Sequence, residues 1–256
     1  MEKTKIEEAV AQYCKAQGYD AMNLRAAMFD MDGVLFDSMK NHAYCWHETM
    51  KHYGFDLPEW EAYMHEGRTG AATINIVSNR ERGHDATAEE IEEIYKYKSD
   101  LFCTRPTAIR MPGSYELLQK VKESGVTPMV VTGSGQVTLL ERLNKNFPDI
   151  FRKELMVTAF DVKYGKPNPE PYLMGMEKYR TWIGESGECL KPNNYIVVEN
   201  APLGVQAGVA AGVFTIAVNT GPLPDDALLD QGANMLFHSM QELCDNWELV
   251  IEALCR

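Results

Sequence analysis

The sequence lacks any long apolar run and is poor in positive charge. No stretch approaches the length of a membrane span, and the first ten residues, MEKTKIEEAV, lack the apolar segment of a signal peptide. Lysine and arginine number 25 against 37 aspartates and glutamates, which gives a formal net charge of −12. An acidic surface repels nucleic acid and anionic membranes. We therefore expect a cytoplasmic protein that binds neither nucleic acid nor membrane.

Paired cysteines are also missing. The six cysteines are scattered and form no C-x-x-C pair and no zinc-type spacing. This usage suits a reducing compartment and argues against a disulfide framework. With 45% hydrophobic and 24% charged residues, the 256-residue chain can bury a sizeable core. We expect one large domain, or a core with a smaller inserted domain, and a monomer.

Short apolar runs bounded by turn residues predict a buried sheet. Five runs have this form, and a shorter sixth run follows at 234–237; the five are 26–30, 127–132, 155–160, 195–199 and 214–218. Helical patterns lie between the later runs, at 113–123, 136–146 and 170–179. Strands that alternate with helices predict an α/β fold, a Rossmann-like parallel sheet with helices on both faces.

Two helical segments lie outside this alternation. In residues 1–23, apolar side chains recur at helical spacing up to Gly18, which predicts an N-terminal helical extension with a packing role. Residues 39–110 contain helical patterns and no strand-like run. We interpret them as an all-helical cap domain inserted after the first strand. The α/β core then comprises residues 24–38 and 111–256.

The strongest chemical signal is FDMDGVLFDS, residues 29–38. Side chains alternate along a strand, so Asp30 and Asp32 point to the same side where the first strand ends. Open α/β sheets bind ligands at that edge. Two close carboxylates can act as a nucleophile and an acid–base group. An ordinary acidic loop is the alternative, but the whole segment directly after an apolar strand disfavours it.

Two further segments predict a phosphate site. In VVTGSG, Thr132 ends an apolar strand, and Gly133 and Ser134 begin a helix, so that a hydroxyl and free backbone N–H groups are available. The alternative is that these residues form only a common strand-to-helix turn. In YGKPNPEPY, Lys166 lies in a loop ahead of a helix. A single loop lysine is usually solvated, but an acidic protein that binds phosphate needs a cation beside its carboxylates.

The fourth segment is VVENAPLGVQAG, residues 197–208. Glu199 and Asn200 lie at the carboxyl end of another apolar strand. Together with Asp30, their oxygen atoms would suit a hard cation such as Mg²⁺. The alternative is that Asn200 only caps the helix that follows.

Taken in order, the four segments resemble the haloacid dehalogenase (HAD) superfamily, in its β-phosphoglucomutase-like branch with a helical cap after the first strand. The resemblance covers the chain beyond the N-terminal helix. It implies that Asp30 is the nucleophile and Asp32 the acid–base group. It implies that Thr132 and Lys166 bind phosphate. It also implies that Mg²⁺ is held by the Asp30 carboxylate, the Asp32 backbone carbonyl and the fourth segment.

Within the superfamily, the sequence is most similar to bacterial HAD-type inorganic pyrophosphatases, through MHEGRTGA, MVVTGSGQ, VTAFDVKYGKPNPEPYLM and ENAPLGV. This likeness implies that His42, Glu66 and Lys98 belong to the site. Two departures stand out. Many relatives have a carboxylate where this chain has Asn200, so the metal site lacks one negative charge. Residues 180–194 form a longer connection than usual, which we interpret as a surface loop.

The predicted reaction is phosphoryl transfer through an aspartyl-phosphate on Asp30, with proton transfer by Asp32. The cap then selects the leaving group. Arg68 and Lys98 are candidates to bind a second phosphate, although solvated surface charges are the alternative. Glu66 is predicted to reach the metal or its waters when the cap closes. We expect a pyrophosphatase; a sugar-phosphate phosphatase or β-phosphoglucomutase is the alternative, and a non-catalytic phosphate-binding regulator a remote one.

Overall fold

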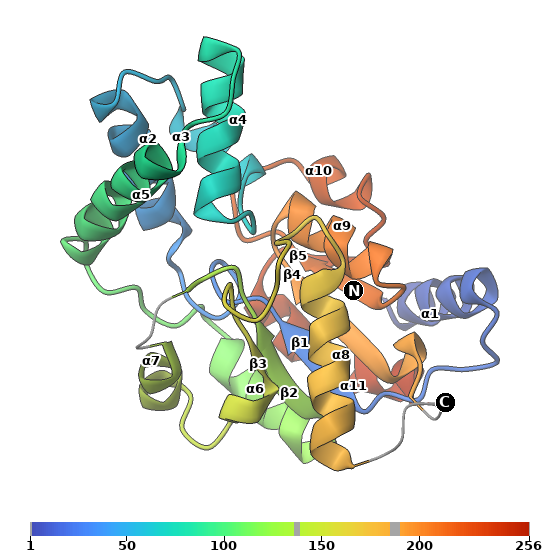
Figure 1. Ribbon diagram of the computed structural model, residues 1–256. Coiled ribbons are helices and arrows are strands. Elements are labelled where there is room, and N and C mark those ends of the chain that lie inside the picture. The colour runs from blue at the N-terminus through green and yellow to red at the C-terminus, as the bar shows by residue number, and fades with distance from the viewer. Residues whose placement is uncertain (1, 136–138, 185–189, 256) are drawn as a thin grey trace.

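A six-stranded parallel sheet forms the centre of the computed structural model, which describes residues 2–135, 139–184 and 190–255 (Figure 1). The strand order is β3-β2-β1-β4-β5-β6. The strands are β1 (Ala26–Phe29), β2 (Thr127–Val131), β3 (Met156–Val157), β4 (Tyr195–Glu199), β5 (Phe214–Val218) and β6 (Met235–Phe237). The predicted α/β class and the sixth strand are confirmed. The third strand is shorter than predicted, because the N–H and hydroxyl of Thr158 both donate to Asp161 and close a turn.

Helices cover both faces of the sheet (Figure 1). On one face lie α6 (Ser114–Glu123) and α11 (Met240–Leu254), and on the other lie α8 (Glu170–Ile183) and α9 (Pro202–Ala210). Strand side chains alternate between the two cores: Ala27 and Phe29 pack on the α6 and α11 side, and Met28 packs on the α8 side. By the same alternation, Asp30 emerges on the α8 side, where the loop before α8 carries Lys166.

The predicted N-terminal helix is present as α1 (Lys3–Gln17), which ends at Gly18 with a φ of 72°. Its buried face consists of Ile6, Val10, Tyr13 and Cys14, which join the core beneath α11. The hydroxyl of Tyr13 donates to the carbonyl of Gly212 at 2.7 Å. These contacts are consistent with the packing role that the sequence predicts.

Four helices occupy the segment that was predicted to be the cap. They are α2 (Met39–His52), α3 (Glu59–Met64), α4 (Gly70–Arg82) and α5 (Ala88–Cys103), and they stand apart from the sheet (Figure 1). They enclose a small core of their own around Met50, Phe55 and Ile74. Residues 39–110, all of which are described, contain no named strand. The segment is therefore helical, as expected, while the boundaries of the domains remain a prediction.

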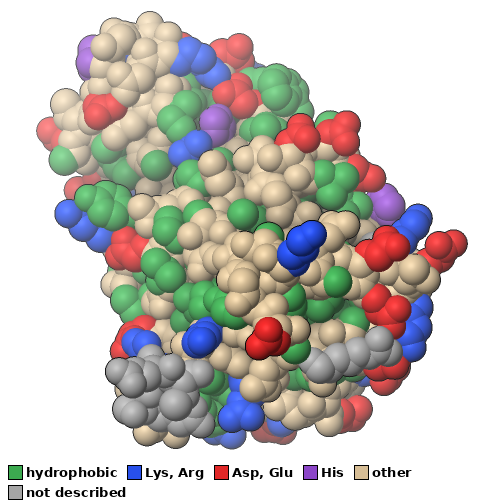
Figure 2. Space-filling view, turned by 90° about the vertical axis from the view of Figure 1, so that its right-hand side faces the viewer, with side chains coloured by type: hydrophobic (Ala, Val, Ile, Leu, Met, Phe, Trp, Pro, Cys, Tyr) green, Lys and Arg blue, Asp and Glu red, His purple; other side chains and the backbone are tan. Residues whose placement is uncertain are grey.

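The remaining elements are short. They are α7 (Leu139–Asn146), α10 (Asp226–Leu229) and the 3₁₀ turns η1 (Lys153–Leu155) and η2 (Pro192–Asn194). The first three residues of the helix predicted over 136–146, and residues 185–189 of the long connection, lie outside the described residues. In the described part of the chain, no helix combines the length and the apolar character needed to cross a membrane. Figure 2 shows one face of the molecule, where acidic side chains are dispersed among basic and hydrophobic ones.

Candidate active site

The predicted nucleophile, Asp30, lies one residue beyond β1. Its backbone N–H donates to the carbonyl of Val198 at 3.0 Å, which keeps it aligned with the sheet. The Nζ of Lys166 lies 2.5 Å from Asp30 Oδ1 and 2.6 Å from Glu199 Oε1, and all three side chains are buried. Burial raises the pKa of Asp30 to about 7; Lys166 opposes this shift and Glu199 adds to it. One ammonium thus faces two carboxylates, which leaves an excess of negative charge at this edge of the sheet.

Glu199 holds this arrangement in place. Its Oε1 accepts from Lys166 and from the hydroxyl of Tyr172, and its Oε2 accepts from the backbone N–H groups of Asn200 and Ala201. A side chain at Gly204 would collide with the carboxylate, so only glycine leaves room for it. Both oxygens of Glu199 are therefore engaged by donors. Glu199 positions Lys166, and its predicted role as a metal ligand remains a prediction.

Asn200 joins the edge of the sheet to the cap. Its Nδ2 lies 3.0 Å from both carboxylate oxygens of Glu66, a residue of the loop between α3 and α4. Its Oδ1 is buried and has no hydrogen-bond partner among the described residues. Gly33 has a φ of 87°, and a side chain there would collide with the Asn200 amide. Burial raises the pKa of Glu66 well above its ordinary value; Asp30 adds to the shift and the Asn200 hydrogen bond opposes it.

These residues fit a bound magnesium ion. A buried carbonyl oxygen without a donor, such as Asn200 Oδ1, is the kind of ligand that Mg²⁺ takes from proteins. The Asp30 carboxylate, disfavoured in its charged form by burial, would be stabilised by a neighbouring cation. Among the described residues no cluster of three or more His, Cys, Asp or Glu is arranged to hold a metal ion. A magnesium site would therefore depend on amide and backbone oxygens, including the Asp32 carbonyl, as well as on Asp30.

The carboxylate of Asp32 is held by a chain of polar contacts that ends on the cap. The hydroxyl of Ser38 donates to Asp32 Oδ1 at 2.5 Å, and His42 Nε2 lies 3.4 Å from the same oxygen. Lys98 Nζ lies 2.8 Å from His42 Nδ1. Burial, followed by the charge of Lys98, lowers the pKa of His42. A lysine ammonium can only donate, so His42 Nδ1 accepts from Lys98 and the ring proton lies on Nε2. Burial acts to raise the pKa of Asp32, but His42, Ser38 and Arg142 outweigh it and hold the pKa below its usual range.

The phosphate-binding segment meets the cap loop directly. Thr132 follows β2, and its Oγ1 accepts from the N–H of Ser134 at 3.0 Å. The two glycines make close approaches between the segments. The Cβ of any side chain at Gly133 would lie 3.2 Å from the carbonyl oxygen of Gly67, and the Cβ of one at Gly67 would lie 3.1 Å from Lys166 Cδ. The loop that carries Glu66 therefore lies against the core, and the cap is closed in this structure.

One cavity of about 800 Å³ collects most of the predicted site. The predicted residues that line it are Asp30, Asp32, His42, Glu66, Arg68, Lys98, Thr132, Gly133 and Ser134. The other three predicted residues lie at the sheet edge: Lys166 contacts both Asp30 and Glu199, and Asn200 contacts Glu66. The structure thus brings all the predicted residues together, while their catalytic and binding roles remain predictions.

Sequence reasoning missed four residues of the site. Ser38 and Tyr172 lie at the ends of two segments that the sequence singled out, and their hydroxyls could have been noted there. Arg105 and Arg142 line the cavity but belong to no motif, so no sequence signal pointed to them.

Comparison with known proteins decides the family. Residues 27–218 match the family described as "Haloacid dehalogenase-like hydrolase", which is more than half of the chain. The chain belongs to this family. This HAD hydrolase is also 60% identical to the structure described as "Putative beta-phosphoglucomutase from Bacteroides vulgatus", with a TM-score of 0.94 and 100% of both chains covered.

Two curated relatives of this HAD hydrolase are described as phosphatases or phosphohydrolases of small molecules. It is 28% identical to hexitol phosphatase A of Escherichia coli over 87% of this chain and 94% of that protein. It is 27% identical to glycerol-1-phosphate phosphohydrolase 2 of Saccharomyces cerevisiae over 87% of this chain and 85% of that protein. The superfamily and its β-phosphoglucomutase-like branch are confirmed. The narrower likeness to HAD-type inorganic pyrophosphatases receives no support from these relatives.

Proposed function

We propose that this chain is a magnesium-dependent phosphohydrolase that acts on a small phosphate-bearing substrate through an aspartyl-phosphate on Asp30. The observation that carries the proposal is the pair of carboxylates at the end of β1. Asp30 contacts the Lys166 ammonium, whereas Asp32 is held by Ser38 and His42. The two acids therefore have different surroundings and can take different roles.

The proposed steps follow from these surroundings. A carboxylate oxygen of Asp30 attacks phosphorus while the bond to the leaving oxygen breaks. Asp32, whose pKa is below its usual range, first takes up a proton from solvent when the anionic substrate binds, and it then donates this proton to the leaving oxygen. Asp32 then removes a proton from the water that attacks the aspartyl-phosphate and restores Asp30. Lys166, the Thr132 hydroxyl and the N–H groups after it offset charge on the phosphoryl oxygens. A bound magnesium ion would supply further positive charge at the same oxygens.

A small sugar or polyol phosphate is the first substrate candidate. The cavity of about 800 Å³ remains open while the cap contacts the core, and this is ample for a phosphorylated six-carbon chain. The relatives that support this choice are described as a hexitol phosphatase, a glycerol-1-phosphate phosphohydrolase and a putative β-phosphoglucomutase. The sequence alone favoured pyrophosphate, on its likeness to HAD-type pyrophosphatases and on the expectation that a bulky sugar phosphate would hold the cap away from the metal. The size of the cavity argues against that expectation.

Inorganic pyrophosphate is the second candidate, and one observation favours it. Glu66 lies at the sheet edge with its carboxylate against Asn200, close enough to Asp30 to raise the pKa of Glu66 further. A carboxylate repels an anionic substrate unless a cation lies between them. Glu66 is therefore suited to a site in which the cap approaches the metal, which a very small substrate permits.

Steady-state kinetics on a panel of substrates tests the proposal. The panel contains a hexitol 6-phosphate, glycerol 1-phosphate, β-glucose 1-phosphate and pyrophosphate, with Mg²⁺ present. We expect phosphate release from at least one polyol phosphate at the highest kcat/KM, and loss of release in Asp30→Asn. A higher kcat/KM on pyrophosphate would move that substrate to first place. Conversion of β-glucose 1-phosphate into an isomer without phosphate release would identify a mutase, and no turnover of any member would leave the phosphate-binding regulator.

A further inference from the structure

Three arginines that line the active-site cavity form no direct ion pair with a carboxylate of the described residues, although the charge of Arg142 acts on Asp32 at longer range. Arg68, Arg105 and Arg142 each have a buried Nε without a hydrogen-bond partner among the described residues. Two arginines on the cap differ in this respect: Arg80 pairs with Glu61, and Arg82 pairs with Glu90. In a chain with a net charge of −12, carboxylates are plentiful, so unpaired arginines around one cavity require an explanation.

A buried donor without a partner costs about 1–3 kcal/mol, and more when the group is charged. Burial also lowers the pKa of Arg68 and of Arg142, since each guanidinium is partly removed from water, and Asp32 opposes this shift at Arg142. Such groups are retained where a ligand completes them. The sequence had already offered Arg68 as a candidate to bind a second phosphate; Arg105 and Arg142 are additional.

Aromatic rings fix the positions of these two arginines. The guanidinium of Arg142, on α7, lies 4.0 Å from the centre of the Phe36 ring, in the turn that follows Asp32. The guanidinium of Arg105, in the link after α5, lies 4.2 Å from the centre of the Tyr44 ring. Stacking on a ring holds the guanidinium plane and leaves its edge free to donate two parallel hydrogen bonds. Both groups are thus pre-oriented without a direct ion pair among the described residues.

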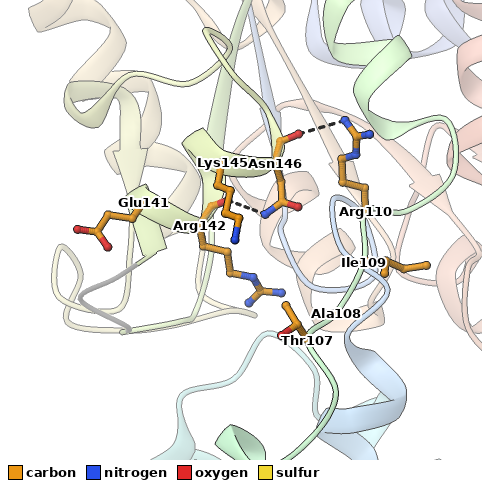
Figure 3. A pocket seen from close by; sticks show the side chains of 8 residues that line it. All are labelled: Thr107, Ala108, Ile109, Arg110, Glu141, Arg142, Lys145 and Asn146. Carbon is orange, nitrogen blue, oxygen red and sulfur yellow. Dashed lines mark hydrogen bonds between the residues drawn. The ribbon is translucent and has the colours of Figure 1, made fainter.

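Arg142 also separates the cavity from a second hollow. Figure 3 shows its side chain reaching from α7 toward Thr107 in the link that follows α5. Thr107, Ala108 and Arg142 line both the cavity and this outer hollow. Lys145, one turn further along α7, lines only the outer hollow. Arg142 therefore faces the cavity from the side of the core, and Arg105 faces it from the link to the cap.

We propose that Arg105 and Arg142 form a subsite for a second anionic group, carried by the leaving group of the substrate. The proposal rests on the proposed phosphohydrolase function and narrows its substrate class to sugar or polyol phosphates that also bear a carboxylate or a second phosphate. Guanidinium groups bind both kinds of anion through paired N–H donors. The neutral end of a simple polyol phosphate would leave these donors unsatisfied.

Two matched substrate pairs test the subsite and separate its two sources of charge. Gluconate 6-phosphate and glucitol 6-phosphate differ only by a carboxylate at C1. Mannitol 1,6-bisphosphate, whose two ends are equivalent, and mannitol 1-phosphate differ by a phosphate. Binding to the Asp30→Asn variant, measured by titration calorimetry, does not depend on turnover. We expect the anionic member of at least one pair to bind roughly 10- to 100-fold more tightly.

The preference ratio within a pair then tests the two arginines. Arg142→Gln and Arg105→Gln should each lower the ratio about tenfold, and Arg142→Lys should restore part of it. Lys145→Gln removes the same charge one turn away and should leave the ratio unchanged, which controls for long-range electrostatics. Equal affinity for both members in both pairs overturns the subsite. So does an equal fall in affinity for both members of a pair in Arg142→Gln. Release of phosphate from p-nitrophenyl phosphate by the unmodified enzyme tests the phosphohydrolase activity itself. Failure of the proposed function can therefore be distinguished from failure of the proposed subsite.

Discussion

The ammonium of Lys98 lies 2.8 Å from Nδ1 of His42, and this contact links a cap charge to the predicted acid–base group. The other ring nitrogen of His42 lies 3.4 Å from Asp32. Phe102 stacks on the imidazole at a centroid distance of 4.2 Å, which keeps the ring between its two partners. Lys98 is buried, and its charge therefore acts in a medium that screens it weakly.

The first prediction concerns the protonation of Lys98. Burial lowers its pKa to about 8, so the side chain is charged below this pH and neutral above it. A neutral amine would no longer hold the proton of His42 on the nitrogen that faces Asp32. We expect kcat/KM to decline as the pH rises above about 8, and Lys98→Arg to move this decline to higher pH because arginine keeps its charge. Superimposable alkaline limbs for the two proteins would contradict this account.

The second prediction separates the two carboxylates. Asp30→Asn should abolish turnover, because an amide does not attack phosphorus, and Asp32→Asn should lower kcat by about 10²–10⁴-fold through loss of proton transfer. Circular dichroism should show that both variants are folded. Mass spectrometry should exclude conversion of the new amide back to the acid. Near-normal kcat in either verified variant would refute the assigned mechanism.

The third prediction concerns magnesium and pH. The pKa of Asp30 is raised to about 7 by burial, with Glu199 adding to the shift, so Mg²⁺ must displace a proton below that pH. We expect the affinity for Mg²⁺ to fall about tenfold for each pH unit below 7 and to level off above it. Titration calorimetry between pH 5.5 and 8.5 measures this. Asp30→Asn should show weaker binding without that slope, and a flat profile for the unmodified enzyme would count against Asp30 as a ligand.

The fourth prediction tests the packing between α6 and α11. Gly113 precedes α6 with a φ of 80°, and a Cβ there would lie 2.5 Å from the Cα of Gln241. Gly125 has a φ of 76° and open space around it. Gly125→Ala should therefore cost only the backbone strain, about 1–2 kcal/mol, while Gly113→Ala should cost more because α11 must move. Urea denaturation of both variants gives their free energies of unfolding. Equal losses of stability would show that the backbone around Gln241 shifts to accommodate the new methyl group at little cost.

The sheet and the four strand-end segments could be predicted because each depends on local sequence. An apolar run bounded by turn residues is buried wherever the sheet forms, and Asp30, Thr132, Lys166 and Asn200 follow such runs or lie in loops beside them. The two-residue length of β3 was not predictable in this way. It depends on the hydrogen bonds from Thr158 to Asp161, which compete with hydrogen bonding between β3 and its neighbouring strand.

Contacts between distant segments could not be predicted from residue patterns. The oxygens of Glu199 are occupied by Lys166 and Tyr172, and the amide of Asn200 meets Glu66 across a separation of 134 residues. The volume left beneath the closed cap is likewise a property of the packed helices. Substrate size, which depends on that volume, was for this reason the least predictable part of the site.

The last prediction uses Glu66 to decide between the two substrate candidates. Its carboxylate lies 3.0 Å from the Asn200 amide, so it belongs to the closed cap. If pyrophosphate is the substrate, Glu66 supplies the negative charge that Asn200 lacks, and Glu66→Ala should lower kcat/KM on pyrophosphate by orders of magnitude but far less on a hexose phosphate.

Glu66→Gln is the matched control, because it keeps the shape and a hydrogen-bonding oxygen while removing the charge. A loss in Glu66→Gln as large as in Glu66→Ala assigns the effect to charge, whereas a loss only in Glu66→Ala assigns it to closure of the cap. Both are read as transition-state free-energy losses on each substrate. Equal losses on the two substrates would give Glu66 a general structural role in the cap. An unchanged rate on pyrophosphate would remove Glu66 from the site and leave the sugar and polyol phosphates as the remaining class, because the cavity beneath the cap accommodates them with Glu66 in place.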